Sequence, residues 1–312
     1  MPIDFIDLFA CPRCKISFAD SKSFNCNNCD IKYPVVNFIP VLINDENSVF
    51  KITDYNSVES SYGGASSYAG NLDNRNGIRQ VYRKLMFRIS ESRPPKIEFD
   101  VAAAVREILS RKPNAKILVI GAGDTSIDGR VIYTDVAFGK MVDCIADAHD
   151  LPFPDGSFDA CIACAVLEHV VDPYRCVQEI TRILKLDGFV YAETPFMQPV
   201  HMKAHDFTRF TFLGHRRLFR NFSEIKSGIA GGPGVSAAQL LRYAISSLSD
   251  RPRLKKWLKL LSILGTYPLR WIDYISHKNI SAYDSASGFY FFGQRTENTM
   301  SDEVLLKSFR GS

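Results

Sequence analysis

The chain has 312 residues, of which 46% are hydrophobic and 23% are charged, and its formal net charge at pH 7 is +4. These values are typical of an ordinary soluble globular protein, and the small net charge argues against a dedicated nucleic-acid binder. The N-terminal sequence MPIDFIDLFACP lacks the cationic start and apolar run of a secretory signal. No uncharged apolar stretch reaches the ~20 residues needed to span a bilayer, so we expect a cytoplasmic protein with reduced cysteines.

Four of the eight cysteines form two CxxC pairs near the N-terminus, CPRC and CNNC. Each pair can hold a metal ion from a tight turn, and a hairpin would bring the pairs together into a tetrahedral thiolate site. The spacing predicts a closed structural zinc site in a module of residues 1–45; the alternative is a lost or redox-active dithiol site. The predicted ligands are Cys11, Cys14, Cys26 and Cys29.

Residues 46–98 are expected to form a linker or lid followed by a helical segment. The stretch NSVESSYGGASSYAGNLDN is rich in Ser, Gly, Asn and Tyr, a composition that favours a loop over a packed element. Helices are predicted at 76–90 and, after the break at Pro94 and Pro95, at 98–111.

From residue 116 onward, short apolar segments alternate with loops or helices. Strands are predicted at 116–121, 131–135, 144–148, 158–166 and 188–195, a late antiparallel strand at 287–295, and a helix at 173–185. This alternation favours an α/β fold with an open, doubly wound sheet over residues 99–312, carrying a helical insertion at about 235–280.

In such a sheet, ligands bind beyond the carboxyl ends of the strands, so the residues that end the predicted strands belong together. The small residues Gly121-Ala122-Gly123 would let a ligand approach the backbone. Asp135 is placed to accept hydrogen bonds from ribose hydroxyls, and Asp147 with Ala148 to meet an adenine ring. A GxG pair alone is a weak signal, but its combination with two strand-end acids is much more specific.

The run ILVIGAGDTS, VIYTDV and DAHDLPFPDGSFDACIACAVLEHVVDPYRCVQEITRILKLDGFVYAETPF resembles the class I S-adenosylmethionine-dependent methyltransferases, in the broad type 11-like group, over about 115–196. The resemblance implies a Rossmann-like methyltransferase sheet and S-adenosylmethionine as cofactor. It departs from the group at Val119, where an acid is usual, and at Thr125, where a third glycine is usual; Asp124 would replace part of the missing polar set. The implied cofactor-binding residues are Gly121, Ala122, Gly123, Asp124, Asp135, Asp147, Ala148, Cys164, Glu168 and His169.

The N-terminal sequence CPRC … CNNCDIKYPVVNFIPVLI resembles the small zinc-ribbon proteins that activate methyltransferases as separate subunits, over residues 8–43. The resemblance implies a zinc ribbon fused ahead of its enzyme, where it would cover apolar surface and brace the lid.

The stretch PFMQPVHMKAHDFTRF, residues 195–210, follows the fifth predicted strand and holds two histidines. Histidine is well matched to proton removal near neutral pH, so His201 or His205, helped by Asp206, is predicted to deprotonate a methyl acceptor. A polar loop without a chemical role and a metal site remain alternatives, although the histidines lack an evident third ligand beyond Asp206. Its pattern also resembles a subgroup found in polysaccharide and cell-envelope biosynthesis, which implies a sugar or glycan hydroxyl as acceptor and places Arg209 on the acceptor side.

Within RPRLKKWLKLLSILG, apolar residues recur at helical spacing opposite three lysines. The helix at 253–264 would either pack on its own domain or make a peripheral contact with an anionic membrane surface. The sequence thus predicts methyl transfer to an acceptor oxygen on a small molecule or glycan. The rivals are a methyltransferase for RNA or protein with the zinc ribbon as recognition module, and a non-enzymatic scaffold with a degenerate cofactor site.

Overall fold

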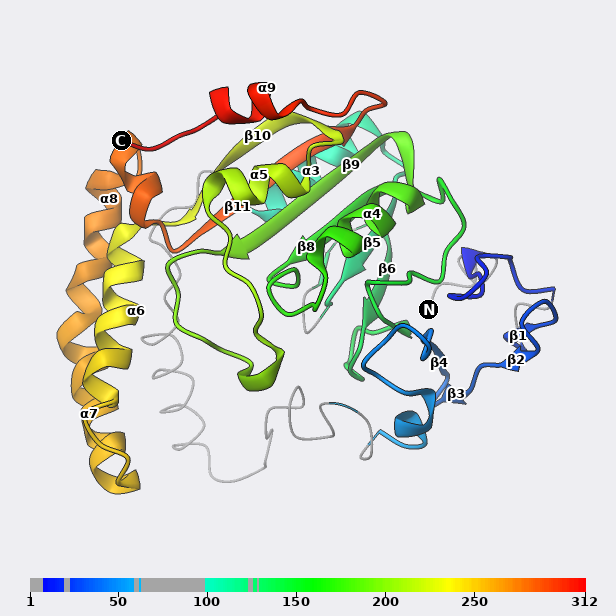
Figure 1. Ribbon diagram of the computed structural model, residues 1–312, viewed down its shortest axis with the longest axis horizontal. Coiled ribbons are helices and arrows are strands. Elements are labelled where there is room, and N and C mark those ends of the chain that lie inside the picture. Colours follow the sequence, from blue (N-terminus) through cyan, green and yellow to red (C-terminus); the bar gives the residue numbers. More distant parts are fainter. Residues whose placement is uncertain (1–7, 20–22, 59–61, 63–98, 123–125, 128) are drawn as a thin grey trace.

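A nine-stranded mixed sheet forms the centre of the molecule in the computed structural model, which describes residues 8–19, 23–58, 62, 99–122, 126–127 and 129–312 (Figure 1). The strand order is β10-β11-β9-β8-β5-β6-β7-β4-β3. Its strands are β3 (Val35–Val36), β4 (Ile39–Leu42), β5 (Lys116–Ile120), β6 (Arg130–Asp135), β7 (Cys144–Ala146), β8 (Phe158–Cys164), β9 (Leu184–Pro195), β10 (Phe222–Gly231) and β11 (Gly288–Arg295). The strands from β9 to β4 run parallel, while β11 is antiparallel to both of its neighbours.

Alternate residues of the central strands are buried on opposite faces of the sheet. Leu118 and Ile132 lie in one core with α4 (Pro173–Ile183), while Ile117 and Val131 lie in the other with α3 (Val101–Arg111). Because both faces are covered, these strands read as continuous apolar runs rather than alternating ones. Strand β5 pairs with β6 on one side and β8 on the other, so the predicted doubly wound α/β sheet is confirmed.

The predicted element boundaries need some corrections. Strand β9 begins at Leu184 rather than at 188, because Leu184 pairs with Phe158 and the chain passes from α4 directly into the strand. Strand β10 was not predicted; its sequence FSEIKSGIAG carries a lysine, a glutamate and an internal glycine, and pairing with β11 makes it a strand. The helix predicted at 98–111 is α3, whereas the one predicted at 76–90 lies outside the described residues.

The N-terminal segment contains a short hairpin, β1 (Asn25–Cys26) and β2 (Ile31–Lys32), followed by β3 and β4. Strand β4 continues the main sheet, with Val41 beside Ile145 of β7. The apolar segment expected to close the zinc module therefore also extends the sheet. Phe9 stacks on Phe153 at 5.4 Å between ring centroids, so module and sheet share one core.

The first part of the predicted linker or lid lies within the described residues, whereas most of the Ser- and Gly-rich stretch at 56–74 does not. Residues 44–58 follow β4 and include the short 3-10 helix η2 (Ile52–Tyr55). Ser48 and Tyr55 are buried, and the Tyr55 hydroxyl donates to the carbonyl of Val136 at 2.7 Å. This part packs on the sheet because its few large side chains find apolar neighbours there.

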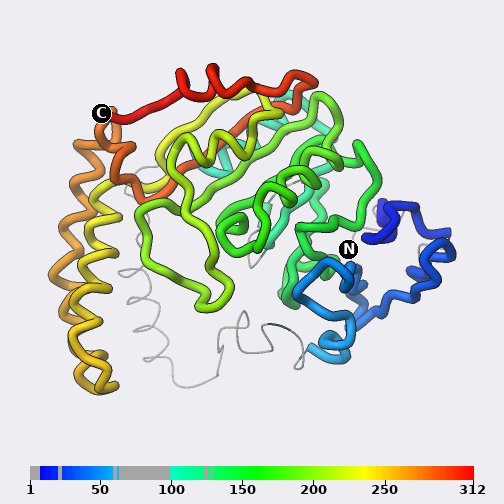
Figure 2. Tube along the Cα trace, viewed as in Figure 1, coloured from blue at the N-terminus to red at the C-terminus, as the bar shows by residue number. Residues whose placement is uncertain are grey.

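The chain between β10 and β11 forms a helical hairpin that projects from the sheet at the left of Figures 1 and 2. It contains α6 (Pro233–Ser246), α7 (Pro252–Thr266), η4 (Tyr267–Trp271), α8 (Ile272–Ser276) and η5 (Ile280–Ser285). Helix α5 (Phe212–Leu218) follows the loop after β9, and α9 (Asp302–Lys307) follows β11. Within the described part of the chain, none of the helices is long and apolar enough to cross a membrane.

Candidate active site

A cleft with about 780 Å³ of space, open solvent included, lies beyond the carboxyl ends of β5, β6 and β7. This main cleft lies at the point where the strand order reverses, the usual place for a ligand in such a sheet. Six of the predicted site residues line it: Gly121, Asp135, Asp147, Ala148, His169 and His205.

Gly121 ends β5 in a conformation and a space that exclude larger residues. Its φ is +65°, a left-handed value that L side chains rarely adopt. A Cβ there would lie 2.4 Å from Cγ2 of Val166, which also lines the main cleft. The glycine therefore keeps this wall of the cleft open.

The two strand-end acids both border the main cleft and are both engaged by the protein. Asp135 accepts from the backbone N–H of Ala137 at 2.9 Å. Asp147 accepts from the Ser48 hydroxyl and pairs through Oδ1 with Nδ1 of His149 at 2.6 Å. Burial opposes ionisation of Asp147, but the hydrogen bonds from His149 and Ser48 lower its pKa. Both carboxylates are thus held in position at the cleft wall.

The loop after β4 supplies one wall of the main cleft that was not predicted. Ser48 bonds Asp147, Phe50 lines the cleft, and Asn44 donates to Asp150 at 2.9 Å. The signal available in the sequence was the apolar segment before this loop, which becomes β4 and carries the loop to the end of β7.

Three other predicted cofactor residues do not line the main cleft. Ala122 is buried in the core, Cys164 packs against the same core, and Glu168 lies behind His169. Gly123 and Asp124 lie outside the described residues.

The loop between β9 and α5 is held by an ion pair. Arg209 contacts both carboxylate oxygens of Asp206, one of them at 2.7 Å, and donates to the carbonyls of Gln198 and Pro199. This guanidinium lowers the pKa of Asp206 to about 2. Asp206 also accepts from the backbone N–H of His201 at 2.6 Å, and its side chain is 1% exposed. It therefore positions the loop rather than facing a ligand.

His201 and His169 face each other across the boundary between two clefts. Their ring centroids are 4.7 Å apart, with Glu168 beside both rings. His169 lines the main cleft, whereas His201 lines a second, side cleft of about 1030 Å³, open solvent included. The Glu168 carboxylate is the largest influence that raises the pKa of His201; Asp206 acts in the same direction and burial opposes them.

The side cleft combines polar and basic groups with apolar surface. Its residues come from the loop after β9 and from the helical hairpin: Gln198, Pro199, His201, Gln239, Arg242, Tyr243, Ser246, Lys255, Lys259 and Ile263. Amide, hydroxyl and cationic groups in this combination suit a ligand with many oxygens and negative charge.

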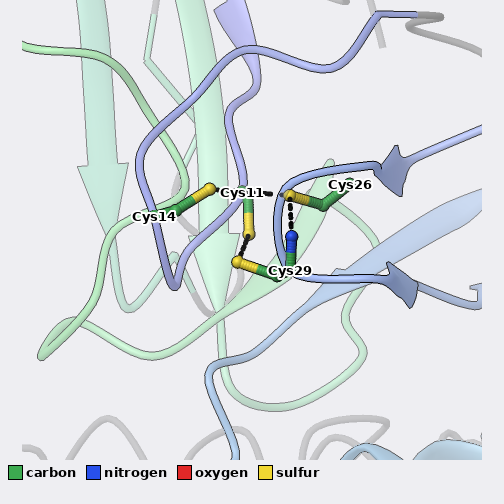
Figure 3. A group of neighbouring side chains, drawn as sticks. All are labelled: Cys11, Cys14, Cys26 and Cys29. Atoms are coloured by element: carbon green, nitrogen blue, oxygen red, sulfur yellow. Dashed lines mark hydrogen bonds between the residues drawn. The ribbon is translucent and has the colours of Figure 1, made fainter.

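The four N-terminal cysteines gather as the sequence predicts (Figure 3). The sulfurs of Cys11 and Cys29 are 3.9 Å apart, and those of Cys14 and Cys26 are 3.5 Å apart. A tetrahedral zinc ion with bonds of about 2.3 Å needs sulfurs about 3.8 Å apart, so the cluster fits that ion. The backbone N–H of Cys29 also points to the Cys26 sulfur at 3.4 Å, as in a metal-binding turn.

Comparison with known proteins agrees with this geometry. Residues 132–192 match the family model described as a methyltransferase domain. The sheet order and this match support a class I S-adenosylmethionine-dependent methyltransferase.

Two curated relatives and one solved structure illustrate the similarity. The ubiquinone/menaquinone biosynthesis C-methyltransferase UbiE of Hydrogenovibrio crunogenus is 26% identical over 215 residues, 62% of this chain and 77% of the relative. The demethylmenaquinone methyltransferase of Paenarthrobacter aurescens is 29% identical over 198 residues, 57% and 70% of the two chains. The 1,6-didemethyltoxoflavin-N1-methyltransferase of Burkholderia thailandensis, solved with S-adenosylhomocysteine, is 13% identical, with a TM-score of 0.39 over 75% and 91% of the chains.

Proposed function

We propose that this protein transfers the methyl group of S-adenosylmethionine, bound in the main cleft, to an acceptor oxygen held in the side cleft. The observation that carries the proposal is the meeting of the two clefts at His169 and His201. A methyl donor on one side of this boundary and an acceptor on the other would be held for in-line transfer.

The lining of the main cleft supports an assignment for each part of the cofactor. Gly121 lets the methionine part approach the backbone, Asp135 accepts from the ribose hydroxyls, and Asp147 with Ala148 meets the adenine. Phe50 and Tyr62 add aromatic surface on the opposite wall. When bound, the cofactor supplies an electrophilic methyl group on a sulfonium.

His205 and His201 are the proposed proton acceptors for the acceptor hydroxyl. His205 lines the main cleft, and its ring lies 4.6 Å from the Tyr62 ring, so it stands on the cofactor side of the boundary. His201 stands on the side-cleft face. Asp206 acts through them, because its ion pair with Arg209 fixes the loop that carries both histidines.

The basic and amide-rich side cleft supports an anionic, sugar- or glycan-like acceptor with a reactive hydroxyl. A second candidate is methyl transfer to carbon, favoured by the two relatives named for quinone methylation. An assay with a ¹³C-labelled methyl donor separates them, since a methyl group on oxygen and one on carbon differ widely in carbon chemical shift. A labelled methyl group on carbon would contradict methyl transfer to oxygen and support the second candidate.

Calorimetry with S-adenosylhomocysteine tests the cofactor site directly. We expect one binding site per chain, with affinity lost in Asp135→Ala and kept in Asp155→Ala, a surface acid paired with Arg182. Absence of binding to the wild-type protein would favour the scaffold alternative. Filter binding with bulk RNA, expected to be negative, checks the RNA-methylating alternative.

Two further assignments accompany this function. We infer that the four N-terminal cysteines hold a structural zinc ion with no open position, which braces the module against the sheet. We also propose that the helical hairpin contacts an anionic membrane surface, since residues 233–278 contain eight Lys or Arg against two Asp. Such a contact suits a lipid-linked glycan acceptor.

A further inference from the structure

Glu168 is a buried carboxylate that lacks hydrogen-bond donors among the described residues. Its side chain is 1% exposed, and among the described residues neither oxygen accepts a hydrogen bond. The nearest side-chain nitrogens are the Nε2 atoms of His169 at 3.6 Å and His201 at 3.8 Å, both too far for a hydrogen bond. Burying a carboxylate without a hydrogen-bond partner is costly, so a bound cation would stabilise this arrangement.

The hydrogen bonding of His169 directs a lone pair toward that carboxylate. Its Nδ1 lies 2.7 Å from the carbonyl oxygen of His205, and a carbonyl only accepts, so Nδ1 carries a proton. In the neutral ring, Nε2 is then an acceptor that faces the Glu168 oxygen, also an acceptor. Metal-binding histidines commonly show this pattern, in which one ring nitrogen donates to a carbonyl while the other binds the ion.

His201 completes the cluster from the other side of the boundary. Its backbone is fixed by Asp206, and its Nδ1 lies 3.5 Å from that carboxylate, which leaves Nε2 on the side of Glu168. One ligand atom each from Glu168, His169 and His201 lie within 4.8 Å of one another. Tetrahedral bonds of about 2.05 Å place ligand atoms about 3.3 Å apart, so small side-chain shifts would close the site on an ion.

We propose that Glu168, His169 and His201 bind a divalent transition-metal cation such as Zn²⁺, Mn²⁺ or Fe²⁺. Two imidazoles and one carboxylate suit these ions better than Mg²⁺ or Ca²⁺, which prefer all-oxygen ligands. Three protein ligands leave coordination positions open, as in catalytic rather than structural sites. The sequence alone did not indicate this site, because Glu168 and His169 follow β8 whereas the third ligand, His201, lies on the loop after β9.

The position of the proposed cation between the two clefts indicates which kind of ligand would complete its coordination. His169 borders the main cleft and His201 the side cleft, so a bound cation would stand where the acceptor meets the methyl donor. We therefore assign an acceptor oxygen as the fourth ligand, whose hydroxyl proton the cation would acidify. This role rests on the proposed function, whereas cation binding itself does not. With His201 as a ligand, His205 remains as the residue that takes the proton.

Cobalt(II) binding to the full-length protein tests the site, measured by equilibrium dialysis, metal analysis and absorption spectroscopy. We expect two ions per chain: one with strong sulfur-to-cobalt charge-transfer bands from the cysteine cluster, and one with only weak d–d bands. His201→Ala, at a half-buried ring, and Glu168→Gln should each lose the second ion and keep the thiolate signal. His205→Ala is the matched control, since it removes a neighbouring imidazole but keeps the carbonyl that orients His169.

One cobalt per chain in the wild-type protein, with thiolate bands alone, would overturn the proposal and leave a proton shared between Glu168 and the histidines. Loss of the second cobalt ion in His205→Ala, to the same extent as in the ligand variants, would also overturn the proposal, because binding would then not depend on the three ligands. Calorimetry with S-adenosylhomocysteine on the same samples separates this result from the proposed function. Binding of a second cobalt ion without binding of S-adenosylhomocysteine would support the metal site and contradict the proposed methyltransferase function.

Discussion

Two glycines with the same backbone conformation have different surroundings. Gly121 and Gly156 have φ values of +65° and +63°. An added Cβ at Gly121 would collide with Val166 in the wall of the main cleft, whereas nothing lies within 4 Å of one at Gly156. The pair therefore separates backbone strain from obstruction of the cleft.

We predict that Gly156→Ala lowers the free energy of unfolding by about 1–2 kcal/mol, since it places alanine in the left-handed region, and that Gly121→Ala lowers it further because of the collision with Val166. Gly121→Ala alone should weaken S-adenosylhomocysteine binding by more than about tenfold, or roughly 1.4 kcal/mol. Urea unfolding and calorimetry measure the two effects. Unchanged affinity in Gly121→Ala would show that the cofactor does not approach this wall.

A buried histidine outside the site makes stability depend on pH. Burial, with a smaller contribution from Arg216, lowers the pKa of His215 to about 3. Since the unfolded chain binds a proton at about pH 6.5, the stability from the neutral ring is complete above that pH and is lost as the pH falls toward 3. Between pH 6 and pH 4 we predict a slope about 1.4 kcal/mol per pH unit steeper in the wild type than in His215→Leu. Equal slopes in urea titrations would contradict this assignment.

At the scale of elements, helix α7 leaves several of its apolar side chains exposed. Leu254, Trp257 and Leu261 are exposed, while Ser262 and Thr266 face α6, where Arg242 donates to Thr266 at 2.7 Å. The predicted helical periodicity is present, and these three apolar side chains do not pack on the rest of the described chain, as the first of the two alternatives would require. An exposed tryptophan and leucines on a basic hairpin favour the membrane alternative.

We predict that the protein co-sediments with vesicles containing anionic lipid and much less with neutral ones. The double substitution Trp257→Ser with Leu261→Ser should reduce binding by at least about tenfold, because it removes two exposed apolar anchors. Leu306→Ser, at a similarly exposed leucine on α9, is the control and should bind as the wild type does. Equal binding by all three proteins would remove the membrane proposal.

Strand β4 links the cysteine module to the main cleft. The module ends in a strand that pairs with β7, and the following loop brings Ser48 to Asp147. A disturbance of the module would therefore reach the wall of the main cleft through β4 and the loop that carries Ser48. The resemblance to separate activator subunits led us to expect a covering role, and the pairing with β7 adds a direct connection.

At the scale of the whole molecule, the module and the sheet share a core, so metal removal should affect both. Chelation of the proposed zinc ion is expected to lower the free energy of unfolding by roughly several kcal/mol, because its four ligands join two separate turns of the module. S-adenosylhomocysteine affinity should fall in parallel as Ser48 loses its position. Thermal unfolding and calorimetry before and after chelation measure these changes, and added Zn²⁺ should restore both. A cleft that keeps full affinity after chelation would show that the module is independent.

The sequence by itself determined the central sheet, the strand-end residues of the main cleft and the four-cysteine cluster. These follow from local information: continuous apolar runs, glycine at the end of a strand, and CxxC spacing. Strand-end acids such as Asp135 meet because parallel strands bring their carboxyl ends to one edge.

Only the tertiary structure decided which side chains meet across long sequence distances. It pairs β4 with β7, places the Ser48 hydroxyl against the Asp147 carboxylate, and pairs Asp206 with Arg209. It also placed His201 beside Glu168 and His169, which the histidine spacing alone does not indicate. Local patterns specify strands and turns, whereas loop paths depend on packing between distant segments, and the boundary between the two clefts consists of such loops.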